Sequence, residues 1–218
     1  MKRVIYFFIV CILLAGFGYH IYRAVNNDVP IIYNEDTNIE KAIKLLKECE
    51  YKEPYNTIKG NNPDNKQIKV TFKNLKNIDE QYENFYALGW RIDNDLYIYI
   101  NEKHKEAPVE AIAALIAGQS VHTDREISRN EEYYSFLLEG YIWKYLTKNK
   151  LITDNSDLTK REETITAIIN KNPGDGSVLI NSINKIEAYK KYKQESTGYT
   201  NNEFQIKFKN LLNLYNKI

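Results

Sequence analysis

The run from Ile112 to His122 has the spacing of a zinc-binding helix but few of its ligands. In the pattern H-E-x-x-H, two His four residues apart share one helix face and bind zinc, while the Glu activates the zinc-bound water. Here Gly118 stands at the first His position, Gln119 at the Glu position and His122 at the second His position. Glycine offers no ligand, and glutamine cannot accept a proton. The motif therefore predicts a helix that keeps the position of a zinc site without its reaction.

Two helices should position these residues. Pro108 favours the start of the first, because a first-turn amide has no partner in the helix, and apolar residues continue to about His122. Ser128 and Glu131 form a capping-box pattern that opens a second helix reaching about Thr147. The second helix is apolar on most sides, which predicts a central position in the fold.

Three segments before the motif have the pattern of strands. Apolar residues alternate from Ile68 to Phe72, which indicates a strand with one buried face. Residues 85–92 and 96–101 flank a short polar turn and predict a hairpin. We expect a small antiparallel sheet packed on a mainly helical body, with residues 96–100 as an edge strand.

These elements predict an α+β fold in one domain. Residues 37–150 carry the strands and the two helices described above, and residues 151–218 add a helical C-terminal third. No internal repeat or low-complexity tract divides them. A formal net charge of +1 without a basic stripe argues against nucleic acid as a partner.

The first 25 residues predict a membrane anchor, followed by a linker over residues 26–36. No formal charge occurs from Val4 to Tyr22, and that length nearly spans a bilayer. Lys2 and Arg3 place the N-terminus in the cytoplasm by the positive-inside rule. The protein should therefore be a single-pass protein of the cell membrane, with its domain on the extracytoplasmic side. A cleaved signal peptide is the alternative, which would leave the domain secreted or periplasmic.

The second helix carries a further run with a metallopeptidase-like pattern. The residues from Tyr134 to Trp143 align with E-A-Y-x-x-E-x-x-x-W, in which Glu139 and Trp143 match and Tyr134 stands at the third zinc ligand. Together with the strand and the degenerate motif, this run resembles bacterial zincin-like metallopeptidases of the gluzincin type over residues 96–145. The resemblance implies a strand along a substrate cleft, a helix with the zinc motif and a later helix with a Glu ligand.

The resemblance implies a scaffold without a working zinc centre. Tyr134 is a poor zinc ligand at neutral pH, because its phenol must lose a proton that ordinarily leaves at a pKa of about 10. Gly118 and Gln119 lack the other required groups. No catalytic residue, metal or other cofactor is therefore expected. The candidate cleft residues are His122, Tyr134, Glu139 and Trp143. Since Glu139 lies among apolar residues, we expect it to pair with an Arg, a Lys or a Tyr hydroxyl.

A zinc site rebuilt around His122 is the alternative. The carboxylates that could join it are Asp124, Glu126, Glu131 and Glu132. The capping box accounts for Glu131, while Glu126 and Glu132 are most simply solvated. His104 lies in the loop before the motif helix and should be exposed.

The leading functional hypothesis is a membrane-anchored extracytoplasmic domain that is zincin-like, has lost peptidase activity and binds a peptide or protein segment. One alternative is a divergent zinc-dependent metallopeptidase that uses His122 and nearby carboxylates. Another is a structural envelope interaction domain unrelated to zincins. Helices that fail to pack face to face, with Gly118, His122 and Tyr134 apart, would favour the last of these.

Overall fold

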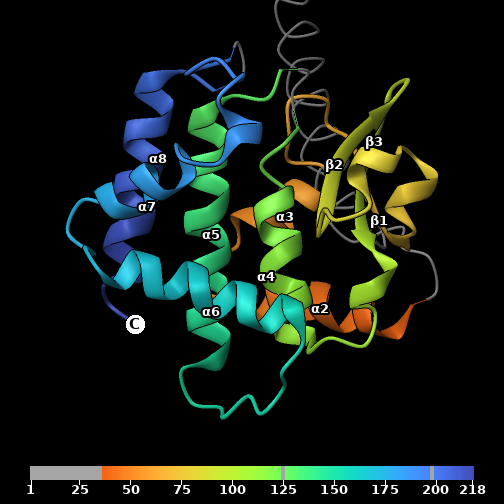
Figure 1. Ribbon diagram of the computed structural model, residues 1–218, viewed down its shortest axis with the longest axis horizontal. Coiled ribbons are helices and arrows are strands. Elements are labelled where there is room, and N and C mark those ends of the chain that lie inside the picture. Colours follow the sequence, from red (N-terminus) through yellow and green to blue (C-terminus); the bar gives the residue numbers. More distant parts are fainter. Residues whose placement is uncertain (1–35, 124–125, 197–198) are drawn as a thin grey trace, which may run out of the picture. The chain divides into compact units, whose positions relative to one another are not determined.

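The computed structural model describes residues 36–123, 126–196 and 199–218 (Figure 1). The predicted membrane segment, residues 4–22, lies outside the described residues. Among the residues that are described, no helix is both long enough and apolar enough to cross a membrane.

Two helices, α4 (Val109–Gln119) and α5 (Arg129–Thr147), pack face to face in the folded unit (Figure 1). α4 is buried along its whole length from Ala111 to Gly118. Its composition of Ala, Ile and Leu suits this position, because a helix that is apolar on all sides must be covered on all sides. α5 begins at the predicted capping box: the Ser128 hydroxyl accepts from the Glu131 amide at 3.2 Å, and the Glu131 carboxylate accepts from the Ser128 amide at 2.6 Å.

The other helices cover this central pair. They are α2 (Thr37–Glu48), α3 (Glu53–Ile58), α6 (Asp157–Asn170), α7 (Ser177–Ile183) and α8 (Asn201–Tyr215). α2 packs on α4, while α6 and α8 pack on α5. The predicted helical C-terminal third is thus formed by α6, α7 and α8, and α6 forms one wall of the candidate site.

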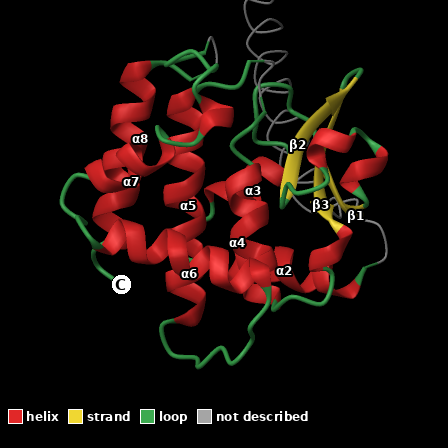
Figure 2. Cartoon of the chain, viewed as in Figure 1, coloured by secondary structure: helices red, strands yellow, loops and turns green. Residues whose placement is uncertain are grey.

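The strands form a mixed sheet rather than the predicted antiparallel one (Figure 2). They are β1 (Ile68–Lys73), β2 (Ala87–Ile92) and β3 (Asp95–Asn101), in the order β1-β3-β2. β2 and β3 make the predicted antiparallel hairpin, but β1 runs parallel to β3. The prediction of residues 96–100 as an edge strand is therefore wrong, because β3 is paired on both sides. The two edge strands of the sheet are β1 and β2, and the unpaired side of β2 will be called its free edge.

α4 ends at Gln119, earlier than predicted. The amides of Val121 and His122 donate to carbonyl oxygens only three residues back, at 3.2 Å each, which tightens the chain into a 3₁₀-type turn. His122 therefore lies beyond the α-helix. The α-helical spacing that would place it one turn from Gly118 is lost.

Candidate functional site

Gly118 and Glu139 meet where α4 packs on α5. A Cβ atom placed on Gly118 would lie 2.7 Å from Cδ of Glu139 and closer still to two other atoms of that side chain. Only glycine leaves room for the carboxylate at this point. The position that the zinc motif reserves for an imidazole is thus filled by the side chain of Glu139.

Glu139 is fully buried and forms an ion pair with Arg161 of α6. The same guanidinium nitrogen, Nη1, lies 2.5 Å from a carboxylate oxygen of Glu162. The guanidinium also lies 5.0 Å from the ring centroid of Tyr86 and 5.3 Å from that of Phe136. The expectation of a partner for Glu139 is confirmed, and that partner is an arginine held between two aromatic rings.

A third buried carboxylate, Glu132, belongs to the same group. Burial and, to a smaller extent, the negative charge of Glu139 together raise the pKa of Glu132 to about 8, against a hydrogen bond from Tyr189. Burial also raises the pKa of Glu162, although Arg161 opposes this. Glu132, Glu139, Arg161 and Glu162 will be called the arginine–carboxylate cluster. Burial thus raises the pKa of all three carboxyl groups, and the Arg161 guanidinium opposes this rise. The prediction that Glu132 is solvated is therefore wrong.

The two other motif residues contact β2. The side-chain oxygen of Gln119 accepts a hydrogen bond from the Gly89 amide at 2.9 Å. His122 lies against the same residue, since a Cβ atom on Gly89 would lie 2.9 Å from Cβ of His122. Gln119 and His122 thus fasten the free edge of β2 to the end of α4.

Tyr134 lies on another face of α5. It is five residues before Glu139, which is about 140° around a helix. Its buried hydroxyl lies 2.6 Å from that of Tyr51 and donates to Glu53 at 2.9 Å. Lys207 pairs with Glu53 at 2.8 Å, and the group borders a second, polar cavity of about 320 Å³. Tyr134 therefore bonds to Tyr51 and Glu53 on one face of α5, while Glu139 meets Gly118 from another. Trp143 is buried one turn after Glu139 and lines neither this cavity nor the larger one described below.

The carboxylates proposed for a rebuilt zinc site have other environments. Glu131 closes the cap of α5, Glu132 belongs to the arginine–carboxylate cluster, and Glu126 is exposed. Asp124 lies outside the described residues. In the part of the chain that the structure describes, no three His, Cys, Asp or Glu side chains are grouped to hold a metal ion.

His104 is buried, and the prediction that it is exposed is wrong. Its ring stacks on Tyr86 with the centroids 4.8 Å apart. Burial and, to a smaller extent, the charge of Lys103 together lower the pKa of His104 to about 4. A neutral imidazole therefore packs on the ring of Tyr86, which also lies beside Arg161.

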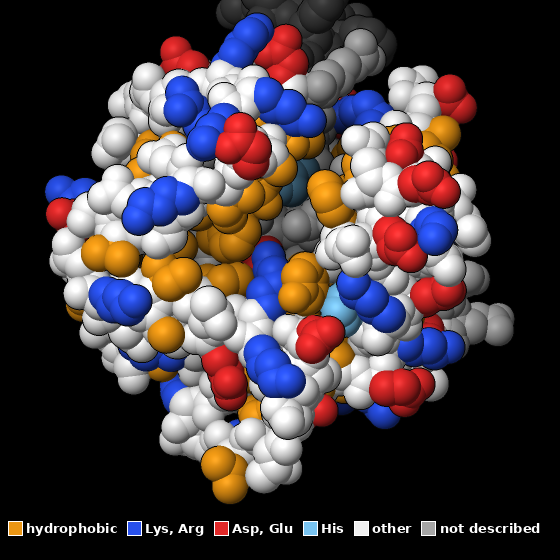
Figure 3. Space-filling model, in the orientation of Figure 1, with side chains coloured by type: hydrophobic (Ala, Val, Ile, Leu, Met, Phe, Trp, Pro, Cys, Tyr) orange, Lys and Arg blue, Asp and Glu red, His pale blue; other side chains and the backbone are white. Residues whose placement is uncertain are grey.

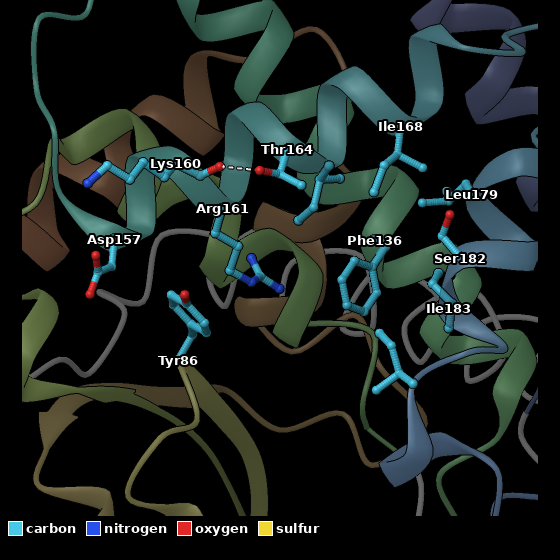
Figure 4. Close-up of a pocket in the computed structure, with 12 residues that line it drawn as sticks. Tyr86, Phe136, Asp157, Lys160, Arg161, Thr164, Ile168, Leu179, Ser182 and Ile183 are labelled. Carbon is cyan, nitrogen blue, oxygen red and sulfur yellow. Dashed lines mark hydrogen bonds between the residues drawn. The ribbon is translucent and has the colours of Figure 1, made fainter.

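A cavity of about 600 Å³ opens beside the arginine–carboxylate cluster (Figure 4). Apolar side chains of α5, α6 and α7 form most of its wall, namely Phe136, Ile165, Ile168, Leu179 and Ile183. Figure 3 shows hydrophobic side chains gathered along a hollow in this face, with a Lys or Arg side chain inside it. The volume is typical of small-molecule sites, which measure about 300–1,000 Å³.

Comparison with known proteins leaves the class of the protein open. No protein-family model, no curated protein and no solved structure matches the chain. The residues of the site and their geometry therefore carry the functional proposal.

Proposed function

We propose that this protein is a non-catalytic binding domain with a zincin-like arrangement, which holds the apolar part of a partner in the cavity beside the arginine–carboxylate cluster. The observation that carries the proposal is the contact between Gly118 and Glu139. At the place where the motif would hold a metal ligand, the Glu139 carboxylate fills the space, and Arg161 supplies the positive charge.

A guanidinium in this place supports binding rather than hydrolysis. A zinc ion would lower the pKa of a bound water and so create a nucleophile at neutral pH. Arg161 neutralises Glu139 but has no open coordination position for water, and Gln119 offers no general base. The metal-bound water and the general base that a zinc peptidase uses are thus both missing from the site.

The zincin-like part of the proposal is supported by the order of the elements. A hairpin strand, a helix that follows Pro108 and a second helix with an inward Glu occur in the order that the resemblance implies. β2 runs antiparallel at the sheet edge and is fastened to the end of α4 by Gln119. Two features depart from the pattern: His122 lies beyond α4, and Tyr134 lies on another face of α5.

The partner is expected to use the cavity rather than strand addition. A peptide that joined the free edge of β2 would need the amide of Gly89, and the side chain of Gln119 occupies it. The cavity wall is open and mainly apolar. A peptide or protein segment and a small amphiphile both present an apolar part that would fit there.

The location of the domain is a separate proposal. The apolar run from Val4 to Tyr22 would hold the domain at the outer face of the cell membrane. Protease added to intact cells should then digest the domain while the N-terminus stays protected. A domain that resists protease until the membrane is broken would contradict this orientation.

The test combines a cleavage assay with a binding assay. The purified protein, supplied with zinc, should leave a mixture of unstructured peptides intact. The neutral apolar dye N-phenyl-1-naphthylamine should bind in the cavity and fluoresce. Thr164 lines the cavity and Glu163 beside it does not, although both are exposed. Thr164→Trp should therefore weaken dye binding at least about tenfold, and Glu163→Trp should leave it unchanged. The proposal would be refuted by zinc-dependent cleavage, or by a dye affinity that is the same in Thr164→Trp as in the unmodified protein.

A further inference from the structure

The cavity is long and follows α6. Asp157, Arg161, Thr164 and Ile168 lie three or four residues apart and line it along one helix face. From Asp157 to Ile168 this face extends about 16 Å at a helical rise of about 1.5 Å per residue. α7 forms the facing wall. The space is therefore a channel between two helices rather than a hole for one side chain.

The channel changes character from one end to the other (Figure 4). Lys160, Arg161 and Tyr86 lie at one end, where α6 begins, together with Asp157. Ile168, Leu179 and Ile183 lie at the other end, where α6 meets α7. A ligand that matches both ends has a polar head and an apolar chain.

The channel walls provide few hydrogen-bond partners for a peptide backbone. Two of the three hydroxyl side chains in the lining are already used within their own helices: Thr164 donates to the Lys160 carbonyl at 2.7 Å, and Ser182 donates to the Val178 carbonyl at 2.8 Å. The third is the phenol of Tyr86, at the polar end. An extended peptide in the channel would leave its amides and carbonyls without partners, which is costly. A hydrocarbon chain has no such groups. The lining therefore favours an aliphatic chain over a polypeptide.

The polar end favours an anionic head. Lys160 is exposed and, within the described residues, has no ion-pair partner within reach. Both ion pairs of Arg161 use Nη1, and the structure records no hydrogen bond from its other two nitrogens to a described residue. Asp157 is the opposing charge at this end and is exposed in the first turn of α6. The charge of Arg161 is balanced by Glu139, but its remaining N–H groups and the Lys160 ammonium are hydrogen-bond donors at this end, and Asp157 is the one carboxylate in the lining. This excess of donors suits a head group with acceptor oxygens.

We infer that the channel binds an aliphatic chain with a carboxylate head, as in a medium- or long-chain fatty acid. The head lies beside Lys160, and the chain lies between α6 and α7. This inference rests on the proposed binding function and names the chemistry of the ligand. It requires only non-covalent contacts.

The test uses dodecanoate and its cationic analogue dodecylammonium, both below their micellar concentrations, with titration calorimetry on the purified protein. Dodecanoate should bind one per chain and at least about tenfold more tightly than octanoate, because each added CH₂ is buried. Lys160→Glu should weaken dodecanoate binding several-fold and strengthen dodecylammonium binding. Asp157→Asn should do the reverse.

Blocking variants show where the chain lies. Thr164→Trp and Ser182→Trp should each abolish dodecanoate binding, while Glu163→Trp and Asn181→Trp, at exposed neighbouring positions outside the lining, should not. Circular dichroism confirms that each variant is folded. The neutral dye separates the two proposals. If the dye binds in the channel but dodecanoate binds no better than dodecylammonium, the inference fails and the binding function stands. If neither binds, both fail.

Discussion

At the scale of single residues, the site depends on a glycine, Gly118, at a position where any other side chain would overlap Glu139. Gly118 lacks a Cβ atom, and the Glu139 carboxylate uses that space to reach Arg161. The sequence shows that Glu139 must have a partner, because a lone carboxylate is costly in an apolar helix. It does not show which one: Arg161 lies 22 residues away on another helix, and the chain has 30 Lys and Arg residues.

Gly118→Ala should destabilise the protein although alanine favours helices. The added methyl group would overlap Glu139, whose carboxylate Arg161 holds in place, so we expect a loss of about 1–3 kcal/mol in the free energy of unfolding. Urea denaturation measures the loss. Gly174→Ala is the control, because its nearest new contact is an Asn172 oxygen at 3.6 Å. In a Glu139→Ala background the same methyl group should cost little. An equal cost in both backgrounds would contradict the overlap.

Arg161→Met should be more damaging. It leaves Glu139 and Glu162 buried without a cation, and breaking a buried ion pair in this way costs about 3–5 kcal/mol. Thermal and urea denaturation measure this loss. Glu187→Gln, which removes the exposed pair with Lys190, should leave the denaturation midpoint unchanged. Comparable effects of the two substitutions would contradict the buried role of Arg161.

The pH dependence of stability should carry a contribution from Glu132. Its folded pKa of about 8 lies above the ordinary value of 4.5, so the folded state holds this proton more tightly than the unfolded state does. The stabilising contribution is complete below pH 4.5 and is lost as the pH rises through 8. Glu132→Gln should therefore reduce the loss of stability between pH 5 and pH 8, by a few kcal/mol at about 1.4 kcal/mol per pKa unit. Urea denaturation at the two pH values measures this.

Two comparisons accompany that measurement. Glu163→Gln, at an exposed position on α6, should keep the dependence of the unmodified protein. His104 contributes with the opposite sign, because its pKa is lowered to about 4 and its contribution is lost as the pH falls from 6.5 towards 4. If Glu132→Gln and the unmodified protein lost equal stability between pH 5 and pH 8, the buried environment of Glu132 would be refuted.

At the scale of elements, local patterns predict more than long-range pairing does. α4, α5 and the β2–β3 hairpin follow from helical periodicity, the Ser128 cap and a short polar turn. The parallel pairing of β1 with β3 has no local signal, because it depends on how the residues between the strands cross over. The early end of α4 also escapes prediction, since no Gly or Pro stands between Ser120 and His122.

The capping box of α5 should contribute measurably to stability. Ser128→Ala removes the acceptor for the Glu131 amide, which should cost about 1 kcal/mol of unfolding free energy. Ser182→Ala is a suitable control, because that hydroxyl bonds only to its own helix. Chemical denaturation compares the two. Equal stability of Ser128→Ala and the unmodified protein would show that the cap is dispensable.

At the scale of the whole folded unit, the site joins elements that lie far apart in the sequence. The channel takes its walls from α5, α6 and α7, and Tyr86, the residue before β2, joins the start of α6 at the polar end. Sequence spacing does not reveal a cavity of this kind, because apolar residues that line a cavity have the same helical spacing as apolar residues that pack in the core. The resemblance over residues 96–145 concerns α4 and α5, whereas the channel lies mostly along α6 and α7.

The measurement that tests the central claim most directly is the zinc content of the protein purified without chelators or a His tag. If Glu139 and Arg161 fill the metal position, zinc should be well below one ion per chain and should stay so after zinc is added and removed by gel filtration. Close to one zinc per chain, lost in His122→Ala, would contradict the account and establish a metal centre.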